Sequence, residues 1–237
     1  MSDLGPSVPR RVKPAWLLFR YGDATRDPQR TSVKLRLPGR RVPTVHDGIF
    51  NHYRGFFGAG RVEEVHWTPG PMASRLPDFH IAKVRPEQPG AMWIFATVGA
   101  WRGTEDEDHG LEFVAVARSE SAAVLTHMGM AAYYHAGPVE NRLGVGHTVT
   151  IGEGWVDGSP LDSLLVSLPY LWGPKLEHCQ LPDRHIQVLW LIPINETERA
   201  YKRTHGADAL EQRFEETSFD YLDPFRPSVV AEAAGDG

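Results

Sequence analysis

The sequence contains very little cysteine, because Cys179 is the single thiol among 237 residues. One cysteine cannot close an intramolecular disulfide, which excludes a disulfide-stabilised secreted scaffold and favours a reducing compartment. The chain also lacks any apolar run of about 18 residues, the length that a membrane-spanning helix needs. Residues 1–14 contain no apolar segment typical of a signal peptide. These absences predict a soluble cytoplasmic protein.

A strong excess of charge of one sign is also absent. Lys and Arg number 25 against 30 Asp and Glu, so the formal net charge is −5. That balance is too mild to predict nucleic acid or an anionic membrane as a partner. With 41 % hydrophobic and 23 % charged residues, the composition is typical of a globular domain. We expect a partly disordered N-terminal extension over residues 1–40, one domain over 41–228 and a disordered tail over 229–237.

The motifs of the common nucleophilic and nucleotide-binding enzymes are missing. There is no G-x-S-x-G elbow, and "LGVGHT" lacks the Lys-Ser/Thr of a phosphate-binding loop. Two other arrangements offer chemistry: Glu153 with Asp157 as an acid and base, or Cys179 with His185 as a nucleophile and base. The first pair lies in "GEGWVDGSPLD", whose Asp-Gly dipeptide is more typical of a turn. A hydrolase-like enzyme for a small molecule is therefore the alternative interpretation.

Metal-ligand spacing is missing as well, although the chain has 11 histidines. Zinc ligands on a helix usually stand one turn apart. His46 and His52 are six positions apart and His127 and His135 are eight, so neither pair has this spacing. The segment "EHCQLPDRH" holds two histidines and the cysteine, but its spacing matches no zinc motif. The sequence therefore predicts no metal and no cofactor.

What the sequence does contain is a series of short apolar runs separated by Pro, Gly and charged turns. They predict six or seven strands, over residues 31–37, 79–86, 92–98, 111–117, 147–151, 163–169 and 186–192. Helices are predicted over 43–58, with Thr44 as its N-cap, over 119–137, and twice near the C-terminus. Few helices lie between consecutive strands, so the predicted class is α+β: one mixed, largely antiparallel twisted sheet with helices packed mainly on one face.

The stretch "LWLIPINETERAYKRTHG" sets several acids directly after an apolar run. Asn195 and Glu198 have the spacing of a capping box, in which each side chain bonds the other residue's backbone amide. Glu198 and Lys202 are spaced for an exposed pair on one helix face. Asp208 and Glu211 repeat the capping pattern for a second helix. The stretch therefore predicts a strand and two capped helices rather than catalytic acids.

Aromatic residues stand in loops outside the periodic runs. Trp155, Tyr170 and Trp172 lie beside Gly and Pro. Tyr and Trp bury a large area at a small entropic cost, so they favour contact surfaces. The other interpretation is that they cover the edge of the core.

The order of the segments resembles the suppressor-of-fused domain family over residues 44–230. The resemblance lies in "FNHYRGFFG", "DFHIAKVRP", "MWIFATVGAW", "LEFVAVA", "GHTVTIGEGW", "SPLDSLLVSLPY" and "VLWLIPINETERAYKRTHGADALEQRF". The resemblance implies an α+β domain that binds proteins and has no known catalytic chemistry. Because the chain ends where the second lobe of eukaryotic members begins, it is similar to the single-lobe bacterial members, which have been proposed as immunity proteins that neutralise toxins.

The resemblance also implies a binding surface. Eukaryotic members hold a peptide of a Gli transcription factor, which contacts a tyrosine at a helix end and an aspartate before "HV". Tyr134 in "AAYYHAG" takes the place of that tyrosine, and His147 matches the histidine, while Gly146 stands where the aspartate would be. The expected partner-binding residues are therefore Tyr134, Gly146 and His147, together with Trp155, Tyr170 and Trp172. The expected partner is another protein, with a toxin as one candidate.

Overall fold

A computed structural model describes residues 44–66, 71–107 and 109–230. By its internal contacts the chain divides into residues 1–42 and residues 43–237, and all described residues belong to the second unit. The predicted strand over 31–37 and the predicted N-terminal extension lie outside the described residues. No helix in the described part of the chain is long and apolar enough to cross a membrane.

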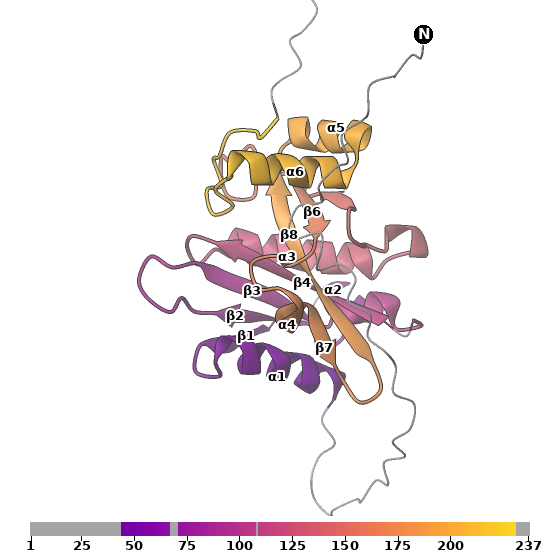
Figure 1. The fold of residues 1–237 in the computed structure, drawn as a ribbon. Helices are drawn as coiled ribbons and strands as arrows, with labels where there is room; N and C mark the ends of the chain where they lie inside the picture. Colours follow the sequence, from indigo (N-terminus) through magenta and orange to yellow (C-terminus); the bar gives the residue numbers. More distant parts are fainter. Residues whose placement is uncertain (1–43, 67–70, 108, 231–237) are drawn as a thin grey trace, which may run out of the picture. The chain divides into compact units, whose positions relative to one another are not determined.

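The described residues form one eight-stranded sheet with the order β1-β2-β3-β4-β8-β6-β5, and β7 pairs with β8 beside this path (Figure 1). Every strand pair is antiparallel except β4 with β8, which is parallel. The strands are β1 (Val62–His66), β2 (His80–Val84), β3 (Trp93–Val98), β4 (His109–Ala117), β5 (Thr148–Thr150), β6 (Ser163–Ser167), β7 (His178–Gln180) and β8 (His185–Ile194). The predicted α+β class and the largely antiparallel sheet are confirmed.

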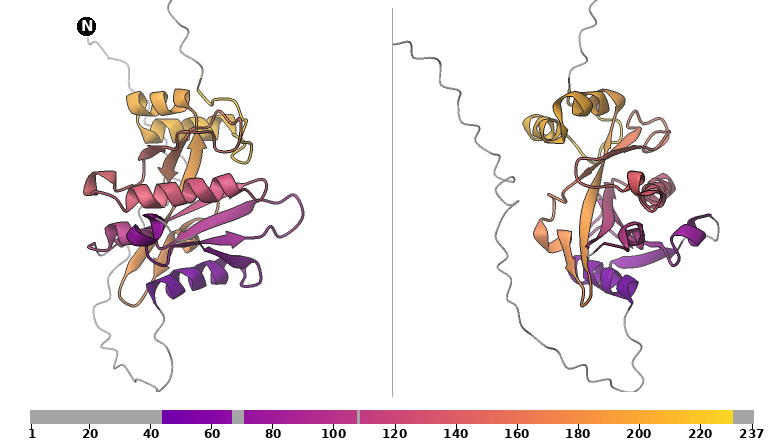
Figure 2. Two further views of the ribbon diagram at one scale, coloured as in Figure 1. Left: turned by 180° about the vertical axis from the view of Figure 1, so that it is seen from behind. Right: turned by 90° about the vertical axis from the view of Figure 1, so that its right-hand side faces the viewer.

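Helices cover both faces of the sheet, whereas the sequence predicted them mainly on one face (Figure 2). Successive residues of a strand point to opposite faces, so the buried strands supply apolar side chains to both layers. The helices are α1 (Val45–Phe57), α2 (Pro71–Arg75), α3 (Ala122–His135), α4 (Pro174–Glu177), α5 (Glu196–His205) and α6 (Ala207–Thr217), with the 3-10 helices η2 (Ala100–Thr104) and η3 (Val139–Asn141). Residues of α1, α4 and α6 pack in one apolar cluster, and residues of α2 and α3 pack in the other.

Local capping signals mark the starts of three helices, α1, α3 and α5. The capping boxes at Thr44 and at Asn195 are both present, as predicted. The prediction for α6 was wrong, because this helix begins at Ala207 directly after Gly206, and Asp208 lies inside its first turn. Gly206 has a φ of +91° and is both the C-cap of α5 and the N-cap of α6, and it has no side chain that could cap α6.

A buried carboxyl group fixes the connection between β3 and β4. Glu112 is fully buried, and its oxygens accept hydrogen bonds from the backbone amides of Gly99, Ala100 and Trp101, at 2.7 to 3.3 Å, and from the Thr97 hydroxyl. Burial raises the pKa of this carboxyl to about 8, and the four donors act in the opposite direction. The sequence pattern of this segment predicted only an apolar strand and gave no sign of a buried carboxyl group.

Candidate functional site

Strand β5 is an open edge of the sheet. It pairs with β6 on one side, and no described strand pairs with its other side. The amide of Val166 donates to His147 O at 2.9 Å, and the amide of Ile151 donates to Asp162 O at 2.9 Å. In an antiparallel pair the direction of the backbone groups alternates, so the peptide groups of Thr148 and Thr150 face away from β6. They form a short template for an added strand.

The loop that leads from α3 to β5 is held by a buried histidine. His135, the last residue of α3, is completely buried, and its Nδ1 accepts a hydrogen bond from the Leu143 amide at 2.9 Å. Burial, with a smaller contribution from the nearby Arg142 charge, lowers the pKa of His135 to about 4, so the ring is neutral. Gly103 leaves space for the ring, since a Cβ there would stand 2.6 Å from His135 Cδ2. The loop therefore has a fixed inner anchor.

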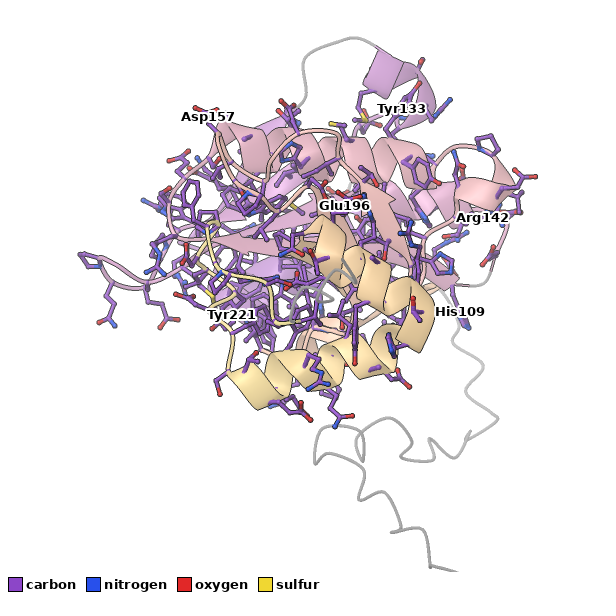
Figure 3. The ribbon with its side chains drawn as sticks, turned by 90° about the horizontal axis from the view of Figure 1, so that it is seen from above. His109, Tyr133, Arg142, Asp157, Glu196 and Tyr221 are labelled. Carbon is purple, nitrogen blue, oxygen red and sulfur yellow. The ribbon has the colours of Figure 1, made fainter. Side chains whose placement is uncertain are left out.

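Arg142 fastens the outer side of the same loop. Its guanidinium forms ion pairs with Asp106, at 2.6 Å, and with Glu107. The backbone oxygen of Arg142 lies 3.1 Å from Nδ1 of His147, which is exposed at the start of β5. Figure 3 shows Arg142 at the outer margin of the molecule, on the side away from Asp157. The loop thus presents His147 on a tethered backbone.

Exposed apolar side chains gather on this part of the chain. Five large hydrophobic residues are prominently exposed in the described structure, and four of them belong to the last turns of α3 or to the loop that follows. We call these four the Tyr134 patch: Met130 (42 % exposed), Tyr134 (39 %), Val139 (66 %) and Val145 (40 %). Met130 and Tyr134 are one helical turn apart, and Val145 is the second residue before His147. Exposed apolar groups concentrated in this way are typical of an interaction site.

Three of the six expected partner-binding residues lie in this region. Tyr134 belongs to the Tyr134 patch, and Gly146 and His147 directly precede the edge strand β5. Gly146 has a φ of +84°, and a Cβ at this position would stand 3.3 Å from the Cβ of Ala207, so the bend into β5 suits a glycine. Met130, Val139 and Val145 could not be predicted from the sequence, because a single apolar residue in a helix or loop carries no signal of exposure.

The other three expected residues are placed elsewhere. Trp155 is only 3 % exposed, and its ring stacks on His127 with centroids 5.6 Å apart. Trp172 is half-buried and packs edge-on against Trp190 on the face of the sheet that α1 covers. The Tyr170 hydroxyl donates to Glu211 Oε2 at 3.2 Å. For Trp155 and Trp172 the interpretation as cover for the core therefore describes the contacts better.

The Cys179 and His185 side chains of the hydrolase-like alternative do not converge. Cys179 lies opposite Ile186 in the β7–β8 ladder and is 1 % exposed, whereas His185 is the next residue along β8 and points to the other face. Burial, followed by the influence of Glu112, raises the pKa of the Cys179 thiol to about 12. Glu153 and Asp157 are exposed. The proposed Cys179–His185 dyad is therefore not formed.

Comparisons with known proteins identify the family of this chain. A family model described as Suppressor of fused protein (SUFU) matches residues 76–227, more than half of the chain. The chain therefore belongs to the suppressor-of-fused family, and the resemblance seen in the sequence is confirmed.

Solved structures share the fold over most of the chain. A suppressor-of-fused homologue from Neisseria gonorrhoeae is 30 % identical with a TM-score of 0.70, covering 80 % of this chain and 98 % of that one. Drosophila Suppressor of Fused is 14 % identical with a TM-score of 0.63, over 79 % of this chain and 51 % of that one. A chain of a Sufu–Fu complex is 12 % identical with a TM-score of 0.62, and the match covers 80 % of this chain and 93 % of that one. At such low identities the last two show the fold alone.

A shorter match links the chain to a named bacterial protein. Immunity protein YqcF of Bacillus subtilis is 34 % identical over 62 residues, which are 26 % of this chain and 32 % of that protein. The chain thus matches about a third of the length of this curated relative.

Proposed function

We propose that this chain is a non-enzymatic protein-binding module that holds an extended segment of its partner against strand β5. The observation that carries the proposal is the open edge of β5, which follows the exposed residues of the Tyr134 patch along the chain. In strand addition, main-chain hydrogen bonds to the edge supply affinity, and alternate side chains of the added strand supply specificity. The outward peptide groups of Thr148 and Thr150 can make the main-chain hydrogen bonds. The exposed apolar side chains of the Tyr134 patch can contact the side chains of the added strand.

The two ends of β5 offer different chemistry to an added strand. At its beginning, Val145 is exposed and His147 is fixed by the loop. At its end, Arg199 of α5 donates from Nη1 to the Thr150 hydroxyl at 2.8 Å, which sets a guanidinium beside the strand. Arg199 already forms ion pairs with Asp162 and Glu196. The partner segment that fits this surface best therefore has apolar side chains near Val145 and a polar side chain near Thr150.

The partner that we propose is a toxin, which the chain neutralises by covering part of its surface in the cytoplasm. The support for a toxin is the match to the relative named an immunity protein. A single buried thiol suits the reducing compartment. As a direct test, a toxin encoded beside this gene is expressed with and without the chain, and the growth of the cells is measured. Growth restored by the parent chain supports the proposal, and unchanged toxicity contradicts it.

A proline in the edge strand tests the mode of binding. Affinity capture from the native cell extract with the full chain identifies the partner, and its dissociation constant is then measured for the parent and for Thr148→Pro. The proline removes an amide that faces away from β6, a position where edge strands tolerate proline. We expect affinity to fall by at least about tenfold, equivalent to about 1.4 kcal/mol, while the melting temperature changes little.

The opposite edge of the sheet provides the matched control. The Arg85 amide donates a hydrogen bond to Arg61 O at 3.0 Å. Because backbone groups alternate in direction along an antiparallel strand, the peptide group of Glu64 in β1 faces away from β2. Glu64→Pro therefore removes an outward amide at the other edge strand and should leave partner affinity unchanged. Equal affinity in Thr148→Pro and the parent would show that the partner does not add a strand to β5.

A further inference from the structure

Two histidines that are seven positions apart meet on the β7–β8 hairpin. In the antiparallel register His178 lies opposite Gln187, and Gln180 lies opposite His185. His178 and His185 are therefore diagonal neighbours on one face of the ladder, within reach of each other's long side chains. Cys179 points to the opposite face and into the core. The hairpin thus brings together two imidazoles whose sequence spacing matches no metal motif.

The separation of the two rings suits a shared metal ion. Nε2 of His185 lies 3.2 Å from Nδ1 of His178. With metal–nitrogen bonds of about 2.1 Å, two nitrogens at that separation subtend an angle of about 100° at the ion. That angle lies between the square-planar and tetrahedral values. The His178 side chain is 50 % exposed, so an ion can reach the pair from solvent.

An outer carboxylate stands behind one of the two rings. Oε1 of Glu177 lies 3.8 Å from Nε2 of His178, the nitrogen that faces away from His185. The same carboxylate oxygen accepts a hydrogen bond from Gln187 Nε2 at 2.8 Å, and the Glu177 side chain is only 13 % exposed. At 3.8 Å the carboxylate does not hydrogen-bond to the His178 ring, but its negative charge favours a positive charge at that ring. This arrangement is independent of the distance between the two rings.

We propose that His178 and His185 bind one divalent transition-metal ion of the zinc and copper class, which clips β7 to β8. Imidazole nitrogen suits these ions, and water completes the coordination. No group of three or more His, Cys, Asp or Glu side chains in the described structure is arranged to hold a metal ion, so the site has two protein ligands and exchanges its ion with solvent. The His109 ring packs edge-on against His185 at 5.5 Å and lies outside the coordinating pair.

Calorimetric titration of the full chain with Zn²⁺ and with Cu²⁺, after treatment with a chelator, tests the site. We expect one saturable site per chain, at least tenfold weaker in His178→Ala and in His185→Ala. Glu177→Gln removes a negative charge 3.8 Å from the His178 ring and should weaken binding, but by less than either histidine substitution. The ion should raise the melting temperature of the parent but not of the two histidine variants, because a ligand that binds only the folded state stabilises it.

His205→Ala provides the matched control, since this histidine is exposed on α5 and hydrogen-bonds to Tyr201 O. It should retain the parent's affinity for both ions. Absence of saturable binding up to about 1 mM ion, a free energy of about −4 kcal/mol, would overturn the proposal. Equal affinity in the parent and in the doubly substituted His178→Ala, His185→Ala variant would overturn it too.

Discussion

Arg226 and Glu198 form a two-point ion pair inside the protein. Nη1 lies 2.6 Å from Oε1 and Nη2 lies 2.9 Å from Oε2, and the two side chains are 3 % and 0 % exposed. Arg226 Nη2 also donates to Pro193 O, and Glu198 Oε1 also accepts from the Val229 amide, each at 2.9 Å. The pair therefore joins the start of α5 to the C-terminal segment. The spacing of Glu198 and Lys202 predicted an exposed pair on one helix face, and that prediction was wrong because Glu198 is fully buried.

Glu198→Ala should destabilise the protein strongly. The substitution leaves the Arg226 charge buried without its counter-ion, and breaking a buried pair in this way costs about 3–5 kcal/mol. It also removes an acceptor for the Val229 amide. Urea unfolding followed by circular dichroism measures the change.

Neighbouring substitutions in the same helix turn provide the controls. Glu196→Ala removes a carboxylate whose side chain is 79 % exposed and should cost less than about 1 kcal/mol. Asn195→Ala removes the cap alone and should cost about 1 kcal/mol. If Glu198→Ala costs no more than these two variants, the buried pair contributes little to stability.

The buried His135 should make the protein less stable in acid. Its pKa falls from 6.5 to about 4 in the fold, so between these pH values the unfolded chain binds a proton that the folded protein does not. Stability from this group is complete above pH 6.5 and is lost as the pH falls towards 4. The difference of about 2.5 pKa units corresponds to at most about 3 kcal/mol.

His135→Asn tests the origin of the acid dependence. The amide oxygen of asparagine can still accept from the Leu143 amide, but the side chain does not titrate. The unfolding free energy of the variant should therefore fall less steeply than that of the parent between pH 6.5 and 4. Parallel curves for parent and variant would assign the acid dependence to other groups.

Tyr134→Ala should weaken the partner without unfolding the chain. The side chain is 39 % exposed, so its loss removes little of the core. A buried aromatic anchor at an interface contributes about 2 kcal/mol or more, which is roughly a thirtyfold change in affinity. Calorimetry with the captured partner measures the change.

Phe225→Ala is the matched control, because Phe225 is the one prominently exposed large hydrophobic residue of the described structure outside the Tyr134 patch, at 57 %. It should leave affinity unchanged. Lys202 serves less well, since it is half-buried and burial lowers its pKa. A folded Tyr134→Ala variant that binds as tightly as the parent would place the partner elsewhere.

Features that depend on neighbours along the chain could be predicted from the sequence. The capping boxes join residues three positions apart, so Thr44 with Asp47 and Asn195 with Glu198 were visible as spacing. Alternating apolar residues likewise revealed most strands. The position of Tyr134 at the end of a helix came from the same local pattern, together with the family resemblance.

Tertiary structure alone decided the pairings between distant segments. Glu198 lies 28 positions from Arg226, and nothing near Glu198 in the sequence indicates that α5 turns this side chain inwards. His178 and His185 meet only because the hairpin register makes them diagonal neighbours. The open edge of β5 likewise depends on which strands pair, since the same three residues in the middle of a sheet would offer no free peptide groups. Local spacing fixes helix ends and strand faces, whereas burial and strand order arise from packing of the whole chain.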